Sequence, residues 1–140
     1  MVRRALLDTG FVVALANARD PDHERCVEVW RDLRAQLFSV EGVLVECAHL
    51  LRRAAGGASA AVHIVYESGT QLLPPSEDRA MRALALMEKY HDVPIDFVDA
   101  LLVAVAEERS IRDVLTLDRR GFEAYRAHGR ERFRVLPDRV

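Results

Sequence analysis

Short apolar runs alternate with longer segments of helical periodicity along this chain of 140 residues, and this alternation limits the possible fold more than any other feature. Within each run the apolar residues follow one another instead of alternating with polar ones, which is typical of strands buried on both faces. Such strands need helices on both sides of their sheet, and helical crossovers favour parallel pairing. The expected strands are residues 4–8, 38–40, 71–73, 113–117 and 133–136.

The segments between these strands predict helices that are separated by turn residues and prolines. After the cap residue Asp22, an apolar stripe at helical spacing runs from Cys26 to Leu37. The other expected helices are residues 11–18, 41–55, 58–67, 76–90 and 96–109. Strands that alternate with helices in this way predict an α/β fold, a three-layer sandwich with a short-stranded, mostly parallel sheet flanked by helices. We expect residues 1–140 to form a single domain.

Composition excludes several classes of protein. Half of the residues are hydrophobic and 30% are charged, which is the balance of a folded chain and not of a disordered one. The two cysteines lie 21 positions apart, so they form neither a zinc ribbon nor a disulfide framework. The apolar run at residues 11–16 is shorter than the core of a signal peptide, and no stretch is long enough for a membrane span. We therefore expect a cytoplasmic protein without a membrane partner.

Four carboxylates stand at positions where a carboxylate is costly. Asp8 and Asp118 end two of the expected strands, and Glu46 and Asp99 lie on apolar faces of helices. Ligands of open α/β sheets bind beyond the carboxyl ends of the strands, so these acids are candidates for one site. Two carboxylates ~5 Å apart repel each other by roughly 3 kcal/mol at an effective dielectric constant of 20. Such a cluster must hold protons or a cation, and oxygen ligands favour Mg²⁺ or Mn²⁺.

Each of these acids also has a purely structural interpretation. Asp8 and Asp118 are placed to cap the helix or turn that follows them, and Asp99 is placed near the positive end of its helix. Asp96 is first of all a helix cap. Glu46 has the weakest alternative of this kind, because it lies in mid-helix with no Lys or Arg three or four residues away.

Two threonines accompany the acids that end strands. Thr9 follows Asp8, and Thr116 precedes Asp118 by two positions. Their hydroxyl groups are candidates for orienting a carboxylate or a water molecule beside a metal ion. The alternative is that both are ordinary turn and strand residues.

In their order and spacing, the four segments that carry the acids resemble the PIN-domain ribonucleases, and in particular the VapC-type toxins of bacterial toxin–antitoxin pairs. The resemblance covers nearly the whole chain and rests on the segments LLDTGFVVAL, VLVECAHLLRR, DFVDALLVAVAE and LTLDRRGF. It implies a PIN-like fold in which Asp8, Glu46, Asp99 and Asp118 are the catalytic acids and bind Mg²⁺ or Mn²⁺, often together with Asp96. It also implies hydrolysis of RNA phosphodiester bonds, an antitoxin protein as partner, and a homodimer.

Arg119 and Arg120 are the predicted contacts to RNA. They open residues 119–140, a segment with seven basic and three acidic residues in a chain of net charge −2. Because clustered carboxylates repel RNA until a metal binds, a neighbouring group must attract phosphate, and the arginine fork is suited to this. The alternative is that both are solvated surface residues.

Two other functions deserve comparison with the nuclease. A receiver-type signalling domain is also α/β with an acidic Mg²⁺ site, but it needs adjacent acids after the first strand and a lysine after the last. Here Asp8 stands alone, and the single lysine, Lys89, falls within an expected helix. The nearer alternative is a catalytically silent PIN-fold module that binds RNA or protein. An assay for Mn²⁺-dependent cleavage separates that module from an enzyme.

Overall fold

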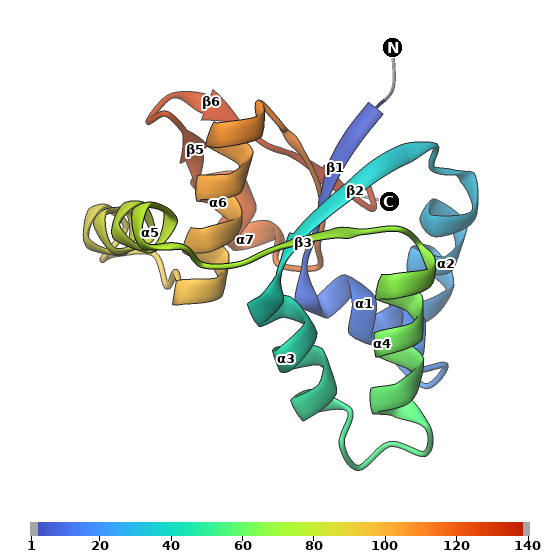
Figure 1. Cartoon of the computed structure of the whole chain (residues 1–140). Helices are drawn as coiled ribbons and strands as arrows, with labels where there is room; N and C mark the ends of the chain where they lie inside the picture. The colour runs from blue at the N-terminus through green and yellow to red at the C-terminus, as the bar shows by residue number, and fades with distance from the viewer. Residues whose placement is uncertain (1–2, 139–140) are drawn as a thin grey trace.

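A parallel sheet lies at the centre of the molecule, with helices on both of its faces (Figure 1). The computed structural model of the chain describes residues 3–138. The sheet has five strands in the order β3-β2-β1-β4-β7, and every neighbouring pair is parallel. The strands are β1 Arg3–Leu7, β2 Ala35–Val40, β3 Gln71–Leu73, β4 Asp113–Leu115 and β7 Arg134–Leu136. The predicted fold class, a helix-flanked sheet of short parallel strands, is confirmed.

Two groups of helices cover the sheet. Helices α1 to α4 gather on one side, and α5, α6 and α7 lie on the other with the small antiparallel hairpin of β5 and β6 (Figure 1). The helices are α1 Thr9–Ala16, α2 His23–Asp32, α3 Glu41–Leu50, α4 Gly57–Glu67, α5 Glu77–Lys89, α6 Phe97–Arg109 and α7 Arg119–Ala124, and the hairpin joins β5 Arg126–Ala127 to β6 Glu131–Arg132. None of the helices within residues 3–138 is long and apolar enough to cross a membrane.

Helix α6 is the most deeply buried helix of the fold. Every residue from Ala100 to Glu107 is buried, because α5 packs along this helix and β2 and β5 contact it. This burial explains why the sequence of α6 is apolar almost all round. On the sheet, Leu6 and Leu7 of β1 have no exposed surface, as expected for a central strand covered on both faces.

The apolar stripe predicted from Cys26 to Leu37 is only partly helical. The helix ends at Asp32, and Leu33 already has extended backbone angles of φ −74° and ψ 128°. Leu37 belongs to β2, where it lies beside Ala5 of β1 and is buried in the core. The expectation that Leu37 extends the helix was wrong, because a buried parallel strand and one face of a helix both present apolar residues in this short stretch.

The strands β1, β2 and β4 end at the same edge of the sheet, and the helices α1, α3 and α7 begin there. Asp8 follows β1 and is the first residue before α1, Val40 holds the same place between β2 and α3, and Asp118 precedes α7. The backbone N–H of Asp8 donates to the carbonyl of Leu115 at 3.0 Å, which joins the ends of β1 and β4. This edge is therefore where the acidic segments meet.

Candidate metal centre

Asp8 is the buried centre of the acidic edge. One carboxylate oxygen, Oδ1, accepts a hydrogen bond from the Thr9 N–H at 2.8 Å, and Oδ2 accepts one from the Thr116 hydroxyl at 2.6 Å. Burial raises the pKa of Asp8 to about 6, although both hydrogen bonds act to lower it, and the charges of Asp118 and Glu46 raise it further. A buried carboxylate that carries this penalty is a group that a cation would stabilise.

Asp118 is tied to the same network through its backbone. Its N–H donates to the Thr116 hydroxyl at 3.0 Å, and its Oδ1 accepts from the Gly121 N–H at 3.1 Å. The carboxylate therefore caps α7, as the structural interpretation of this acid predicted. Its side chain is exposed at the edge of the sheet, so the cap does not close it off from a ligand.

Glu46 reaches the network from α3. Its Oε1 accepts a hydrogen bond from the Thr9 hydroxyl at 2.6 Å, across 37 positions of sequence. The side chain is half-buried, because Val43 on the same face packs into the core while Leu50 is 59% exposed. Thr9 and Thr116, the two threonines singled out by sequence, thus each donate to one of the four acids.

Asp99 and Asp96 share the first turn of α6. Asp96 is the cap of this helix, and its Oδ1 accepts from the Asp99 N–H at 2.8 Å, so the predicted cap is confirmed. Burial raises the pKa of Asp99 to about 8, with further contributions from the charges of Asp8, Asp96 and Asp118. A backbone hydrogen bond from Asp96 acts to lower this pKa, whereas the charges of the three neighbouring aspartates act to raise it.

The donor set suits a hard divalent cation. It consists of carboxylate oxygens that repel one another, and the charges that act on the pKa values of Asp8 and Asp99 come from neighbouring carboxylates. Among the described residues, however, no three His, Cys, Asp or Glu side chains already surround one point at metal-binding distance. Glu46 and Asp118 are instead bonded to Thr9 and Gly121. An ion would have to draw these two carboxylates inward, and all-oxygen ligation then favours Mg²⁺ or Mn²⁺.

Sequence analysis did not single out Gly121 and Tyr125, which lie beside Asp118. A Cβ atom on Gly121 would stand 2.4 Å from Asp118 Oδ2 and 2.8 Å from the Tyr125 hydroxyl oxygen, so a side chain has no room there. The signal available in the sequence was a glycine inside a helix, three positions after a capping acid.

The two arginines after Asp118 differ in their surroundings. Arg119 donates to Glu123 Oε1 at 2.9 Å, to the carbonyl of Val135 at 3.4 Å and to the carbonyl of Pro137. Arg120 is exposed, and no hydrogen bond or ion pair within the described part of the chain holds its guanidinium group. Of these two arginines, Arg120 is therefore the one whose guanidinium group can meet a phosphate without first breaking contacts.

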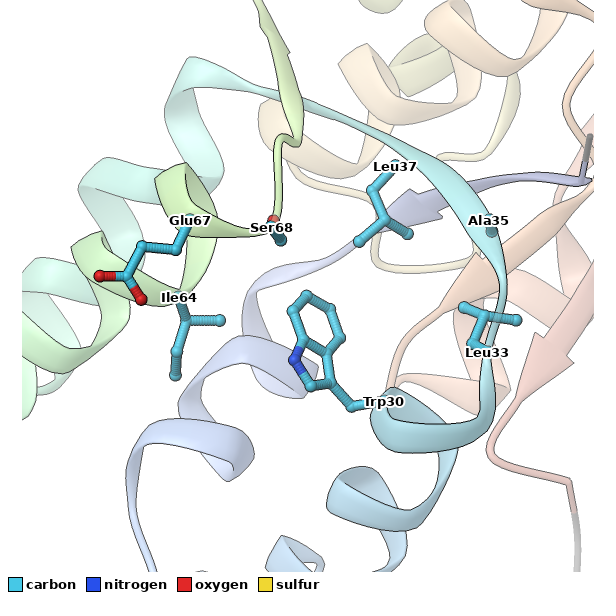
Figure 2. Close-up of a pocket in the computed structure, with 7 residues that line it drawn as sticks. All are labelled: Trp30, Leu33, Ala35, Leu37, Ile64, Glu67 and Ser68. Atoms are coloured by element: carbon cyan, nitrogen blue, oxygen red, sulfur yellow. The ribbon is translucent and has the colours of Figure 1, made fainter.

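A second hollow lies away from the acids, between α2, β2 and α4. It has a volume of about 340 Å³. Figure 2 shows the indole of Trp30 between Leu37 and Ile64, with Glu67 at the rim. Trp30 also packs against Phe11 of α1, with ring centroids 6.2 Å apart. The lining is Trp30, Leu33, Ala35, Leu37, Ile64, Glu67 and Ser68.

Comparison with known proteins identifies the family. The family model of the PIN domain matches residues 5–127. The chain belongs to the PIN domain family. All of the acids described above lie within the matched stretch. The PIN domain is also 31% identical over 134 residues to Ribonuclease VapC26 of Mycobacterium tuberculosis (strain ATCC 25618 / H37Rv), a match that spans 94% of this chain and 99% of that protein. This identity places the chain in the VapC branch of the family.

Solved structures agree with this family. VapC20 of Mycobacterium tuberculosis, a toxin that cleaves the sarcin–ricin loop, is 26% identical with a TM-score of 0.72, and the match covers 79% of this PIN domain and 86% of VapC20. VapBC2 of Rickettsia felis, solved on a DNA fragment from its promoter, is 12% identical with a TM-score of 0.63 and coverage of 95% and 98%. At the latter identity the likeness is one of fold.

Proposed function

We propose that this PIN domain is a metal-dependent endoribonuclease of the VapC type, the toxin of a toxin–antitoxin pair, and that residues 1–140 work as one domain. The observation that carries the proposal is the meeting of four acids at one edge of the sheet, in a chain of the VapC branch. Thr9 and Thr116 link Asp8, Glu46 and Asp118 by hydrogen bonds. Asp99 lies close enough to Asp8 and Asp118 for their charges to act on it. Each of the four acids comes from a different element, so the fold brings them together and they are not simply neighbours in the sequence. In this proposal the protein acts in the cytoplasm, where it would meet both an RNA substrate and an antitoxin.

The catalytic acids in this proposal are Asp8, Glu46, Asp99 and Asp118. They would hold Mg²⁺ or Mn²⁺, which supplies neutralisation of phosphate charge and activation of water when bound. Thr116 holds Asp8 and the Asp118 backbone in register, and Thr9 holds Glu46. Asp8 and Asp99 must give up protons before they serve as ligands, because the pKa of each is raised. Asp96 remains a predicted ligand, although its Oδ1 is used by the α6 cap.

Arg119 and Arg120 remain the predicted phosphate contacts, but they differ in how readily each can bind a phosphate. Arg120 is exposed next to Asp118 and is free to bind a phosphate of the substrate. Arg119 would first have to leave Glu123 and the carbonyls of Val135 and Pro137. We therefore assign the larger share of the electrostatic attraction for RNA to Arg120.

The inferred protein partner is an antitoxin. The hollow between α2 and α4 is apolar around Trp30, Leu37 and Ile64, which suits the apolar face of an amphipathic helix (Figure 2). Glu67 at its rim would favour a basic residue on that helix. Homodimer formation, which the VapC resemblance implies, is a further prediction.

Asp8→Asn tests the enzyme. The substitution keeps the size of the side chain and removes one ligand charge, so we expect RNA cleavage with Mn²⁺ to fall by roughly 100-fold or more, the usual loss when one direct electrostatic contact is removed. We expect the variant to keep its fold, and circular dichroism and the melting temperature measure this. Asp32→Asn is the matched control, because Asp32 is exposed at the end of α2 far from the acids in the fold.

Two outcomes would contradict the proposal. Cleavage by Asp8→Asn at the rate of the wild type and of Asp32→Asn would exclude Asp8 from the catalytic site. A folded wild-type protein that binds RNA but cleaves none under Mn²⁺ would leave the silent binding module as the function.

A further inference from the structure

Tyr125 lies between two of the segments that carry the acids. It is the residue at which α7 ends, and its backbone N–H donates to the Gly121 carbonyl at 2.9 Å. The side chain has no exposed surface. Its ring packs edge-on against Phe122 and Tyr90, with centroids 5.2 and 5.4 Å away. The orientation of the ring is therefore fixed, and with it the position of the hydroxyl group.

The Tyr125 hydroxyl joins α7 to the segment that starts α6. It donates a hydrogen bond to the carbonyl of Pro94 at 3.0 Å. Pro94 comes two positions before Asp96, the cap of α6, which in turn holds the N–H of Asp99. Within residues 3–138, the other hydrogen bonds of the 91–96 segment stay inside it or go to the adjoining helices α5 and α6. Tyr125 thus supplies the hydrogen bond that ties this segment to α7.

Gly121 lets the same hydroxyl approach Asp118. A Cβ atom on Gly121 would lie 2.4 Å from Asp118 Oδ2 and 2.8 Å from the Tyr125 oxygen, so both oxygens lie close to the space that this glycine leaves open. Burial, followed by the charges of Asp99, Asp118, Asp96 and Asp8, raises the pKa of Tyr125 above its ordinary value. A phenol with an ordinary pKa of about 10 is already protonated at neutral pH, so the hydroxyl serves as the donor to the Pro94 carbonyl.

We propose that Tyr125 and Gly121 are positioning residues of the acidic site, an inference that rests on the proposed metal-dependent function. The Tyr125 hydroxyl sets the spacing between the Asp96–Asp99 turn and α7, and Gly121 leaves room for Asp118 against that hydroxyl. Carboxylates that must converge on one ion bind it more weakly when the segments that carry them are free to separate. Neither residue touches the substrate in this proposal, so both act through the affinity for metal.

Titration of the full chain with Mn²⁺ by isothermal titration calorimetry tests the proposal. Tyr125→Phe keeps the ring and removes only the hydroxyl, and we expect Mn²⁺ to bind roughly 10-fold more weakly, as for other residues that orient metal ligands. The cleavage rate should return to the wild-type value at saturating Mn²⁺, because Tyr125 contacts no reacting atom.

Tyr90→Phe is the matched control. Tyr90 belongs to the same aromatic cluster. Its hydroxyl accepts from the Arg126 N–H at 2.8 Å and donates to the Arg126 carbonyl at 3.4 Å, so it contacts the β5–β6 hairpin and none of the acids. We expect both variants to lose similar thermal stability, and only Tyr125→Phe to lose Mn²⁺ affinity. Equal loss of affinity in the two variants would make the role of Tyr125 merely structural and would overturn the proposal.

Gly121→Ala provides a second, independent variant. Its methyl group would force Asp118 Oδ2 or the Tyr125 hydroxyl aside, so Mn²⁺ affinity should fall here too. Wild-type affinity in both Tyr125→Phe and Gly121→Ala would overturn the positioning role alone. A wild-type protein that binds no Mn²⁺ would instead overturn the proposed nuclease, and the positioning role with it.

Discussion

At the scale of single residues, Thr116 connects the acids of two neighbouring strands. Its hydroxyl donates to Asp8 Oδ2 and accepts from the Asp118 N–H, and its side chain is 1% exposed. One hydroxyl therefore fixes both a carboxylate and the backbone of a second acid. Since this hydrogen bond also lowers the pKa of Asp8, Thr116 reduces the cost of ionising that group.

We predict that Thr116→Val weakens the binding of metal and shifts the pH range of Mn²⁺ binding upward. Valine keeps the shape but leaves the Asp118 N–H and the buried Asp8 Oδ2 without their partner, which should lower the free energy of unfolding by about 1–3 kcal/mol. The pKa of Asp8 should rise further, so Mn²⁺ should bind only at higher pH. Mn²⁺ titrations across a pH series measure this shift. Thr116→Ser keeps the hydroxyl and should behave as wild type, whereas an unshifted profile in Thr116→Val would contradict the role.

The candidate acids could be found from sequence because each occupies a recognisable place. Asp8 and Asp118 follow apolar strands, and Glu46 and Asp99 interrupt apolar helical faces. The contacts of Arg119 could not be predicted in the same way, because two of its partners are backbone carbonyls near the end of the chain. Any residue offers a carbonyl, so the sequence around an arginine does not reveal such a contact.

At the scale of elements, Glu107 joins α6 to α5 and to the β5–β6 hairpin. Its carboxylate accepts two hydrogen bonds from Arg82 of α5, at 2.8 and 2.9 Å, and one from the backbone N–H of His128 at 2.7 Å. Burial acts to raise the pKa of Glu107, but the bonds from Arg82 and His128 outweigh it and hold the pKa below its ordinary value. The sequence predicted α6 and its cap, but not this hairpin. Strands of two residues have no apolar pattern, and this hairpin is held by contacts distant in sequence.

We predict that Glu107→Gln loosens the hairpin without changing Mn²⁺ affinity. The neutral amide loses the ion pair and at least one hydrogen bond, which should lower the free energy of unfolding by about 1–3 kcal/mol. Since the folded pKa of Glu107 is lowered, its stabilisation is complete above the unfolded pKa and disappears as the pH falls through the folded value. The difference between wild type and variant in urea unfolding should therefore vanish in acid.

Glu108→Gln is the control for this element. Glu108 pairs with Arg79 on the same two helices, but its side chain is 44% exposed. Ion pairs open to solvent contribute about 0–1 kcal/mol, so this variant should stay close to wild type. Equal destabilisation by the two substitutions would show that burial of Glu107 is not what matters.

At the scale of the whole molecule, the class of fold followed from sequence, but the arrangement of its strands did not. Continuous apolar runs indicated buried parallel strands, as in β1. The order β3-β2-β1-β4-β7 depends on which faces the crossover helices cover, and every run is similarly apolar. The same ambiguity hid the start of β2 at Ala35, because Leu37 fits a helical stripe as well as a strand. The acidic edge was nevertheless predictable, since all parallel strands end on one side.

The last prediction concerns the stability of the whole chain against pH. Asp8 and Asp99 have folded pKa values of about 6 and about 8, raised from 3.8 by burial and by like charges. Without metal, the folded state holds these protons while the unfolded state loses them, so stability should fall as the pH rises from about 4 to about 8. For Asp8 the shift corresponds to about 3 kcal/mol at 1.36 kcal/mol per pKa unit. Glu107 acts with the opposite sign, but its contribution is complete above about pH 5.

Mn²⁺ should reverse this loss, because it binds the ionised carboxylates of the folded state and competes with their protons. Thermal unfolding between about pH 5 and pH 8, in chelator and in Mn²⁺, should therefore give a metal-induced rise in melting temperature that is small in acid and large in base. Asp8→Asn removes one of the two penalties, so its metal-free stability should fall less steeply with pH and its gain from Mn²⁺ should shrink. A rise from Mn²⁺ that is equal at both ends of this range would mean that the ion binds elsewhere than at the carboxylates of Asp8 and Asp99.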